Sequence, residues 1–485
     1  MQQYQITFLP DNLICSVPAG TTLLQAQIDA GLHPNAPCAG KGTCGKCRVL
    51  LDGQEVLSCQ TVVDRDMTVT LPHRAESQIL TSGQGVSLIP DKAHRYCLAF
   101  DIGTTTVVAY LLDGQTGALL ATDSAVNPQS QYGADVISRI QYALEQDPLP
   151  LQQCIRSALA QLTRQVAQKA SISPEEITAA AIVGNTAMHH LLLGIDPKPL
   201  VTPPYMPTVY EALELPCDGF LPIGGNVRIL PNIAGFVGGD TVGCMVSTRF
   251  DKLDKLTLII DIGTNGEMVL GDQNRRIACS TAAGPAFEGA KISCGMRGAE
   301  GAVDRVTLEN GEISHHVIGD VPATGLCGSG LLDLVAVLLE QEIIDESGYL
   351  EDDEFTLCPN VTLTQKDVRE VQLAKAAIRA GIELLCSQMG VEVSDIQQVY
   401  LAGAFGNYMD PASACRIGMI PPCLENRIHP IGNAAGTGAQ LCAVNADEFE
   451  YAKSLAQNTE FLELASLPEF QDCYVDALEF SEEEL

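Results

Sequence analysis

The sequence contains no tryptophan, few aromatic residues and little positive charge. Aromatic residues make up 5% of the 485-residue chain, and 28 Lys and Arg residues stand against 60 Asp and Glu residues, for a net charge of −32. An acidic surface of this kind repels phosphate backbones and anionic lipids, so we expect neither nucleic acid nor a membrane as a partner. Apolar runs such as LTLIID are too short to cross a bilayer, and the opening MQQYQITFLP lacks the features of a secretory signal.

What the sequence does contain is an ordinary globular composition with many cysteines. Hydrophobic residues make up 46% and charged residues 18% of the chain, and its length suits two to four domains. Most of the 18 cysteines stand singly in apolar stretches, where thiols are common core residues. Such thiols persist in a reducing compartment, so we expect a cytoplasmic protein of an anaerobe.

One stretch crowds three cysteines into eleven residues. PCAGKGTCGKC (37–47) contains Cys38, Cys44 and Cys47, and Cys59 follows in VLSC. Short glycine-rich loops of this kind aim several sulfurs at one point and turn backbone N–H groups toward an iron–sulfur cluster. Zinc is the alternative, but a zinc ribbon usually offers two CxxC pairs and this stretch offers one. The spacing favours an iron–sulfur cluster.

The segments around these cysteines alternate in polarity as paired strands do. QYQITFLP and LICSVP predict two strands, TTLLQAQIDAG predicts a short helix, and CRVLLDGQEVLSC predicts a hairpin that turns at Asp52-Gly53. In this order they resemble the β-grasp fold of plant-type [2Fe–2S] ferredoxins, although the last cysteine gap is shorter. The resemblance implies a one-electron carrier whose cluster ligands are Cys38, Cys44, Cys47 and Cys59.

An aspartate–glycine turn occurs twice between apolar strands. YCLAFDIGTTTVVAYLL (96–112) and LTLIIDIGTNGEMVL (256–270) each contain a strand, Asp-Ile-Gly-Thr, a turn and a second strand. Glycine lets the backbone approach a phosphate, N–H groups and Thr hydroxyls bind its oxygens, and an aspartate at the strand end can hold Mg²⁺ through water. One copy is common in turns of many proteins, but two copies in register indicate a duplicated fold that binds phosphate.

Three further glycine clusters follow an apolar strand: 180–194 (AAIVGNTAMHHLLLG), 399–410 (VYLAGAFGNYMD) and 431–444 (IGNAAGTGAQLCAV). With the two turns, this set resembles the superfamily of acetate and sugar kinases, Hsc70 and actin. The resemblance implies two ribonuclease-H-like lobes that close on Mg-ATP, with 180–190 and 431–444 as the connecting helices. The residues that it assigns to Mg²⁺ and nucleotide are Asp101, Gly103, Thr104, Thr105, Asp261, Gly263, Thr264, Asn265, Gly403 and Gly406.

Two other features could serve the same site. Asp240, in IAGFVGGDTVGCM, is placed like the aspartate that activates the acceptor hydroxyl in sugar kinases, and here it could orient water for ATP hydrolysis. Alternatively it caps a helix, because Asp is a common first residue there; Glu267 is a second candidate for the catalytic role. The glycine-rich stretch 280–303, with Glu288, Lys291, Arg297 and Glu300, is predicted to contact nucleotide or a partner.

The expected fold class is therefore a multidomain α+β and α/β protein, in which a β-grasp ferredoxin domain precedes a two-lobed actin-like ATPase. We predict a ferredoxin domain over 1–75, a linker over 76–95, ATPase lobes over 96–253 and 254–465, and an acidic tail over 466–485.

This fusion resembles the reductive activators of corrinoid proteins, as do the stretches DIGTTTVVAYLLD, QYGADVISRI and GLCGSGLLDL. The resemblance implies an enzyme that transfers one electron from a [2Fe–2S] cluster to cob(II)alamin, giving cob(I)alamin, in a step coupled to Mg-ATP. It implies as partners a corrinoid protein, from a methyltransferase or the acetyl-CoA pathway, and a low-potential donor such as a ferredoxin. Longer members carry an extra domain between the ferredoxin domain and the ATPase lobes, where this chain has only a short linker. Dimerisation can therefore not be carried over from the family, and a homodimer stays an open alternative.

Two other functions also stay open. A small-molecule kinase with a redox-sensing cluster would release a phosphorylated product, although the scarcity of aromatic residues leaves no evident sugar-binding patch. A nucleotide-gated scaffold, like the chaperone relatives, would show no redox turnover with any partner.

Overall fold

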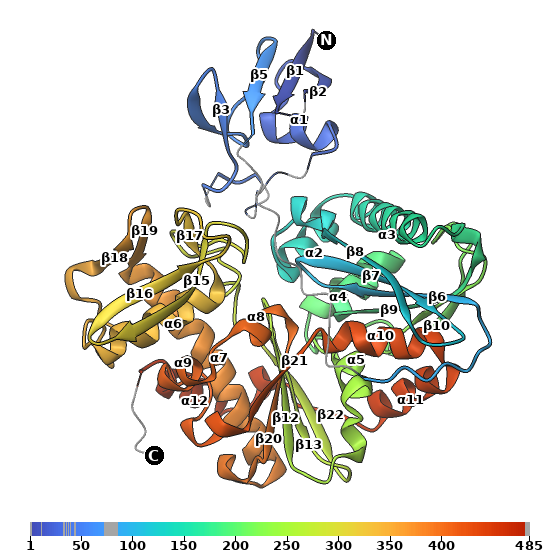
Figure 1. The fold of residues 1–485 in the computed structure, drawn as a ribbon, viewed down its shortest axis with the longest axis vertical. Helices are drawn as coiled ribbons and strands as arrows, with labels where there is room; N and C mark the ends of the chain where they lie inside the picture. The colour runs from blue at the N-terminus through green and yellow to red at the C-terminus, as the bar shows by residue number, and fades with distance from the viewer. Residues whose placement is uncertain are drawn as a thin grey trace.

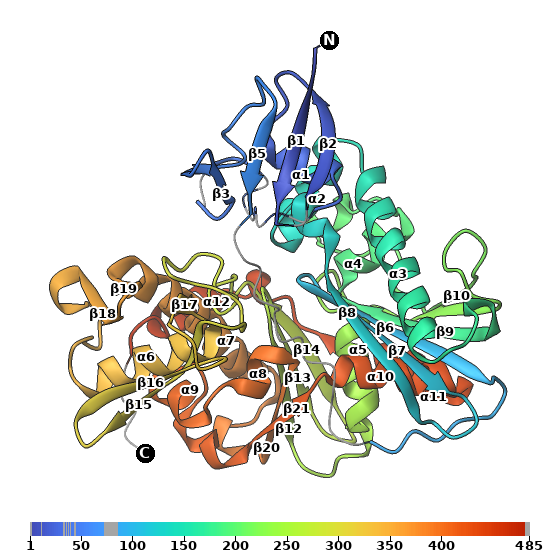
Figure 2. The same ribbon diagram turned by 45° about the horizontal axis from the view of Figure 1, so that its top comes forward.

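The computed structural model describes residues 2–10, 12–32, 34, 36, 38, 40–42, 45–71 and 86–480. It consists of a small N-terminal domain and two larger lobes (Figure 1). A second view shows the small domain at one end of the molecule, above both lobes (Figure 2). None of the helices in the described part of the chain is long and apolar enough to cross a bilayer.

The N-terminal domain has the expected β-grasp arrangement. Its elements are β1 (Gln3–Leu9), β2 (Leu13–Pro18), α1 (Leu23–Asp29), β3 (Arg48–Leu51), β4 (Gln54–Leu57) and β5 (Met67–Thr70), in the sheet order β2-β1-β5-β3-β4. Thr22 caps α1 by accepting a hydrogen bond from the N–H of Gln25, and Asp52 and Gly53 turn the β3–β4 hairpin with positive φ angles. One face of the sheet and the apolar side of α1 enclose the core of what we call the ferredoxin domain.

The first of the two lobes, predicted to form part of an ATPase, is built on a six-stranded sheet in the order β10-β11-β9-β6-β7-β8. Its elements are β6 (Tyr96–Ile102), β7 (Thr106–Asp113), β8 (Leu119–Val126), α2 (Val136–Glu145), α3 (Leu149–Lys169), β9 (Ile177–Gly184), α4 (Thr186–Leu193), β10 (Leu213–Pro216), β11 (Asn226–Ile229) and α5 (Gly239–Thr248). β6 is buried along almost its whole length because helices cover both faces of the sheet.

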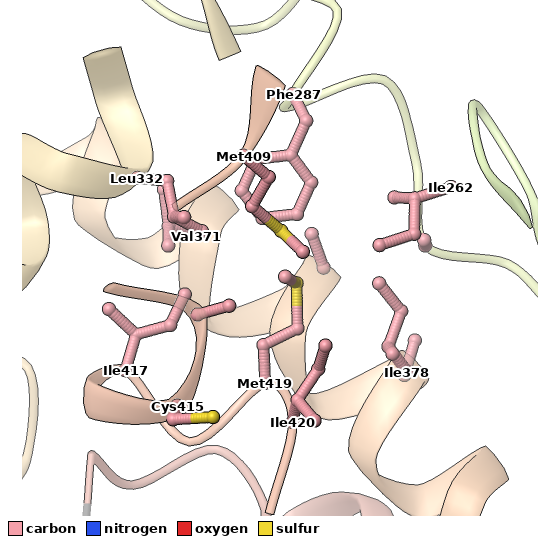
Figure 3. Close-up of a cluster of buried hydrophobic side chains, with 14 of the residues drawn as sticks. Ile262, Phe287, Leu332, Val371, Ile378, Met409, Cys415, Ile417, Met419 and Ile420 are labelled. Atoms are coloured by element: carbon pink, nitrogen blue, oxygen red, sulfur yellow. The ribbon is translucent and has the colours of Figure 1, made fainter. Parts of the chain in front are cut away.

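The second lobe contains a matching six-stranded sheet in the order β21-β20-β12-β13-β14-β22. Its elements are β12 (Thr257–Ile262), β13 (Gly266–Gly271), β14 (Arg276–Thr281), β15 (Ala302–Glu309), β16 (Glu312–Val317), β17 (Gly325–Leu326), α6 (Gly328–Glu340), β18 (Glu354–Cys358), β19 (Val361–Thr364), α7 (Gln365–Met389), β20 (Gln398–Ala402), α8 (Gly403–Tyr408), α9 (Pro411–Arg416), β21 (Ile428–Gly432), α10 (Ala434–Val444), α11 (Ala446–Gln457), β22 (Glu460–Phe461) and α12 (Phe470–Asp476). Figure 3 shows part of its core, where Ile262 of β12, Ile378 of α7 and Met419 contribute to one buried cluster.

The same substructure occurs in both lobes. The strand that ends in Asp-Ile pairs antiparallel with the next strand and parallel with a later one: β6 with β7 and β9, and β12 with β13 and β20. Asp101 lies opposite Val108, and Asp261 lies opposite Glu267, each one residue before its strand ends. The predicted duplication and the two-lobed fold class are therefore confirmed.

Of the two helices between the sheets, α10 is the one predicted at 431–444, and the other differs from the one expected. α5 and α10 pack against each other, and one buried cluster joins them to strands of both sheets, including Ala99 of β6 and Ile259 of β12. α4 lies instead with α3 on the other face of the first sheet. The assignment of 180–190 to a connecting helix is therefore wrong, and α5 takes that place. Because α4 is buried along nearly all its length, its hydrophobic pattern does not indicate which sheet face it covers.

The predicted tail and linker also differ from expectation in their described parts. Residues 466–480, assigned to an acidic tail, include α12, which packs on α7, and Phe480, which is 2% exposed. The buried ammonium of Lys375 donates to the backbone oxygen of Glu479. In the linker, Leu88 packs on the first lobe, and Asp91 donates its N–H to the backbone oxygen of Val444.

Candidate functional site

A cavity of about 370 Å³ lies between the two ATPase lobes, where the two Asp-Ile-Gly-Thr turns face each other. The predicted residues that line it are Asp101, Gly103, Thr104, Thr105, Asp240, Asp261, Gly263, Thr264, Asn265, Glu267 and Gly403. The duplicated strand ends and the start of α8 thus meet at one place, although Asp101 and Gly403 are about 300 residues apart in the chain.

Four carboxylates converge in this cavity. Burial raises the pKa of Asp101 to about 6, and burial together with the charge of Asp101 raises the pKa of Asp261 to about 6. Burial and the nearby Asp261 raise the pKa of Asp240 to about 7, and burial and Asp240 raise the pKa of Glu267. Burial and mutual repulsion make it unfavourable for these carboxylates to be charged together. A divalent cation among them would offset this repulsion. Among the described residues no three of these carboxylates lie close enough together to hold a metal ion directly, so the donor set fits Mg²⁺ bound through several of its own waters.

Asp240 does not serve as a helix cap. The N-cap of α5 is Gly238, and Asp240 lies in the first turn, where one of its carboxylate oxygens accepts a hydrogen bond from the N–H of Thr241. Its side chain lines the cavity with Asp261. The structural alternative considered from the sequence is thus not observed, and Asp240 is available to a ligand in the cavity.

Two asparagines that line the cavity support the first turn, and sequence reasoning gave them no role. Asn185 follows β9 and donates from Nδ2 to Thr104 Oγ1 at 3.0 Å, and Asn433 follows β21 and donates to Asp101 Oδ2 at 2.8 Å. Each also caps the helix that it begins, α4 or α10. The signal was present as a repeated Gly-Asn pair at the end of an apolar strand, in IVGN and PIGN.

A buried arginine also supports the first turn. Arg139 of α2 is fully buried and donates from Nη2 to the backbone oxygen of Thr104 at 2.6 Å and from Nε to that of Gly133 at 2.9 Å. Burial lowers its pKa to about 10. Nothing in the helical pattern of α2 marks this residue, because a lone Arg on a helix is usually exposed.

The glycine-rich stretch 280–303 reaches the cavity through Glu288. Its carboxylate accepts hydrogen bonds from Thr105 Oγ1 at 2.7 Å and from Thr264 Oγ1 at 2.6 Å, one from each turn. The preceding residue, Phe287, stacks on Phe405 of α8 with ring centroids 4.7 Å apart. The stretch named from composition therefore contributes a specific side chain to the cavity.

The two glycines of the GAFG motif have different roles. Gly403 has a φ of +78°, and a Cβ atom there would lie 2.6 Å from Asp261 Oδ1, so only glycine fits. Gly406 is not among the residues that line the cavity; it lets α8 approach Leu401 of β20. Gly406, assigned to the nucleotide from the sequence, therefore lies outside the cavity lining, inside the short helix that the motif forms.

The cysteine loop of the ferredoxin domain gathers three described thiols. Cys47 and Cys59 are buried in one small cluster with Leu24 and Ala36, and burial, contact with Cys47 and the nearby Cys38 raise the pKa of Cys59. Gly40, Gly42 and Gly45 have positive φ angles, as a loop that wraps a cluster requires. Cys44 lies outside the described residues.

These thiols form a partial donor set for an iron–sulfur cluster. Within the described part of the chain, no three His, Cys, Asp or Glu side chains already lie close enough together to hold a metal ion. Sulfur is nevertheless the donor that iron–sulfur clusters use, and thiols that meet in a buried loop of left-handed glycines fit one. The Nε2 of Gln60 also lies 3.7 Å from Cys59 Sγ, where it would donate to a cluster-bound sulfur.

The ferredoxin domain touches the second ATPase lobe through this loop. Lys46, between Gly45 and Cys47, donates from Nζ to the backbone oxygens of Ile292 at 3.3 Å and Gly295 at 3.0 Å. The cysteine loop and the stretch 280–303 are thereby in direct contact.

Comparison with known proteins gives a consistent result along the whole chain. Residues 6–70 match the 2Fe-2S iron-sulfur cluster binding domain, residues 96–253 the RACo middle region, and residues 255–485 the C-terminal domain of RACo, the ASKHA domain. The chain is 37% identical over 475 residues to the corrinoid activation enzyme RamQ of Eubacterium limosum, covering 88% of this chain and 80% of that protein. The chain belongs to the family of reductive activators of corrinoid proteins.

Other relatives agree with this family. The chain is 25% identical over 426 residues to a reductase of the Co(II) methylated amine-specific corrinoid protein from Methanosarcina barkeri, covering 79% of this chain and 77% of that protein. The solved structure of a reductive activator for a corrinoid, iron-sulfur protein is 28% identical, with a TM-score of 0.73 over 98% of both chains. As a corrinoid-protein activator, the chain binds a [2Fe–2S] cluster, ATP and Mg²⁺.

Proposed function

We propose that this chain is an ATP-dependent reductive activase of a corrinoid protein. It transfers one electron to the cob(II)alamin of its partner, giving cob(I)alamin, and Mg-ATP binding and hydrolysis between the lobes drive the transfer. The observation that carries the proposal is the contact of Lys46, in the cysteine loop, with the stretch that also reaches the ATPase cavity through Glu288. Its relatives named as corrinoid activation enzyme and corrinoid-protein reductase support the same partner.

We assign the cluster ligands to Cys38, Cys44, Cys47 and Cys59. When bound, the [2Fe–2S] cluster supplies a one-electron carrier. The burial of Cys47 and Cys59 and the glycine φ angles support this assignment, because they keep bulk water away from two sulfurs and leave backbone N–H groups free to turn inward. A low-potential donor such as a ferredoxin would supply the electron. We expect the reaction in the cytoplasm, where buried thiols stay reduced.

We assign the ATP side to the residues of the cavity. Asp101 and Asp261 would hold Mg²⁺ through water, and Asp240 would orient the attacking water. The Thr104, Thr105, Thr264 and Asn265 side chains and the turn N–H groups would bind the phosphates. Phe405 and Gly403 lie at the start of α8, which suits the adenosine end. The convergence of the four carboxylates supports this arrangement.

Energetics explain why one chain needs both sites. For one electron, 59 mV corresponds to about 1.4 kcal/mol, so an acceptor about 150 mV below the donor costs ~3.5 kcal/mol. Binding or hydrolysis of ATP can supply this free energy by shifting the complex of the chain with the acceptor protein to a different conformation.

The test uses anaerobically purified protein loaded with iron and sulfide. It is mixed with a low-potential reductant and a corrinoid protein, with and without Mg-ATP, and the cob(I)alamin absorption band is recorded. We expect the band only when ATP is present. A band that forms equally without ATP, or phosphate transfer from ATP to a metabolite with no corrinoid reduction, would contradict the proposal.

A further inference from the structure

The carboxylate of Glu288 ties together the two turns that face the cavity. Thr105 belongs to the first lobe and Thr264 to the second, and each donates its hydroxyl hydrogen to one of the two Glu288 oxygens. A charged acceptor between two hydroxyl donors makes hydrogen bonds of the stronger class. Glu288 therefore holds the two lobes together at the point where the phosphates are expected.

Phosphate and Glu288 compete for this position. The following step rests on the proposed nucleotide site. A phosphate oxygen that accepts from Thr105 or Thr264 takes the same hydrogen that Glu288 now accepts, because each hydroxyl has one. Two negatively charged acceptors a few ångströms apart also repel each other in a cavity that is already acidic. Binding of the triphosphate therefore requires the Glu288 side chain to leave.

Glu288 lies in a short segment, 285–296, whose backbone is held by packing and hydrogen bonds on both sides of the residue. On one side, Phe287 is 5% exposed and packs into the core of the second lobe (Figure 3). On the other side, the backbone folds back so tightly that a Cβ on Gly295 would lie 2.4 Å from the oxygen of Gly289. The N–H of Met296 donates to the oxygen of Leu326 in β17 at 2.8 Å, which ties the end of the segment to the sheet. A shift of the backbone at Gly289 therefore displaces Gly295.

The same segment holds the ferredoxin domain. The oxygens of Ile292 and Gly295 accept the hydrogen bonds from Lys46, whose chain neighbour is Cys47. One continuous path thus runs from the two threonine hydroxyls through Glu288, Gly289 and Gly295 to Lys46. Such a path can couple the nucleotide cavity to the Lys46 contact if the 285–296 segment has two arrangements and each site favours one of them.

We propose that the 285–296 segment couples nucleotide binding to docking of the ferredoxin domain. While Glu288 bridges Thr105 and Thr264, the segment holds the cysteine loop through Lys46. When the triphosphate enters, it displaces Glu288, the segment shifts at Gly289 and Gly295, and the Lys46 contacts are released. The ferredoxin domain is then free to approach the corrinoid partner. Glu288 acts in this device as a positioning residue.

The first test measures backbone amide exchange of the full-length, cluster-loaded protein with and without a non-hydrolysable ATP analogue and Mg²⁺. We expect the analogue to raise the exchange rates of amides in 45–48 and 289–295 at least several-fold. Slower exchange in the turns around Gly103 and Gly263 reports independently that the analogue is bound. This measurement needs no variant and no corrinoid protein.

The second test measures the affinity of the analogue for variants by calorimetry. Glu288→Gln keeps the size of the side chain but removes its charge, and we expect about tenfold tighter binding, within the usual range of coupling between sites. Glu300→Gln removes an equal charge from an exposed position of the same stretch and serves as the matched control. Because coupling is reciprocal, Lys46→Met, which loses the docking contact, should also tighten binding, whereas Lys41→Met at an exposed position of the cysteine loop should not.

The outcomes separate this inference from the proposed function. If the analogue binds but exchange in 45–48 does not change, or if Glu288→Gln and Lys46→Met both bind it as the wild type does, the coupling is wrong and the proposed function stands. If the wild type does not bind the analogue at all, both are overturned. Combination of the two substitutions gives a further check, because tightening through a shared path should be less than additive.

Discussion

A Cβ atom placed on Gly438 would lie 2.2 Å from the backbone oxygen of Gly243. The two helices between the sheets, α10 and α5, therefore cross backbone to backbone. α5 carries Asp240 in its first turn, and α10 is capped by Asn433, which donates to Asp101. The close crossing of these two helices therefore brings together elements that carry Asp240 and that contact Asp101.

Gly438→Ala should separate the two helices. Alanine favours a helix over glycine by about 1 kcal/mol, but a contact this short with a backbone oxygen forces a shift that typically costs 1–3 kcal/mol or more. We expect a lower unfolding temperature and weaker ATP binding. Gln440→Ala, on the same helix and only half-buried, is the control and should change neither. Calorimetry of unfolding and of nucleotide binding checks both; an unchanged unfolding temperature in Gly438→Ala would contradict the prediction.

Asp240→Asn should separate hydrolysis from binding. If Asp240 orients the attacking water, the substitution lowers the rate of ATP hydrolysis by about 10²–10⁴-fold and leaves the affinity for ATP nearly unchanged. Asp261→Ala should instead weaken use of Mg-ATP, because the metal loses its partner, and should leave the visible spectrum of the protein intact. Phosphate release and equilibrium binding of ATP distinguish the two variants. Wild-type hydrolysis by Asp240→Asn would exclude the proposed role.

Cys47→Ser should abolish corrinoid reduction while ATP binding survives. The serine oxygen is a poor substitute for a thiolate ligand of iron, so the visible spectrum should be lost or strongly altered. Cys97→Ser is the matched control: this thiol is also fully buried, but it lies in β6 of the first lobe, away from the cysteine loop. Iron and sulfide analysis with the visible spectrum provides the measurement. Normal iron content in Cys47→Ser would show that another ligand set holds the cluster.

The buried His189 should make the folded state less stable in acid. Burial and the neighbouring His190 lower the pKa of His189 to about 4, whereas an exposed histidine has a pKa near 6.5. Between these values the unfolded chain binds a proton that the folded chain does not, so the free energy of unfolding falls as pH falls, by up to roughly 1.4 kcal/mol per pH unit. Above about pH 6.5 His189 is neutral in both the folded and the unfolded chain, so this loss of stability is absent.

A variant isolates this effect. His189→Asn keeps an acceptor near the position of Nδ1, which now accepts from Asn232 Nδ2 at 2.9 Å. Denaturant unfolding between about pH 5 and pH 7 should show a shallower pH dependence in His189→Asn than in the wild type. His429→Asn, at an exposed position, should leave the slope unchanged. Equal slopes in all three proteins would contradict the assignment.

The sequence by itself determined the domain types and the chemistry. Cysteine spacing, alternating polarity and the turn at Asp52-Gly53 are local properties, so they predicted the β-grasp domain and its thiol loop. The two Asp-Ile-Gly-Thr turns are local as well, and their recurrence predicted the duplicated sheets. Residues whose role depends on a local turn or loop could therefore be identified from the sequence before their contacts in the folded protein were known.

Only the tertiary structure decided which residues meet. Asn433 and Asp101 are 332 positions apart, and Thr105 and Glu288 are 183 apart, so no local pattern links them. A buried helix such as α4 has no polar face to show where it packs, and for this reason its predicted place was wrong while α5 was overlooked. The contact of Lys46 with Gly295 depends on how the ferredoxin domain docks on the second lobe. Its acceptor is a backbone oxygen, which every residue type carries, so the sequence gives no signal for it.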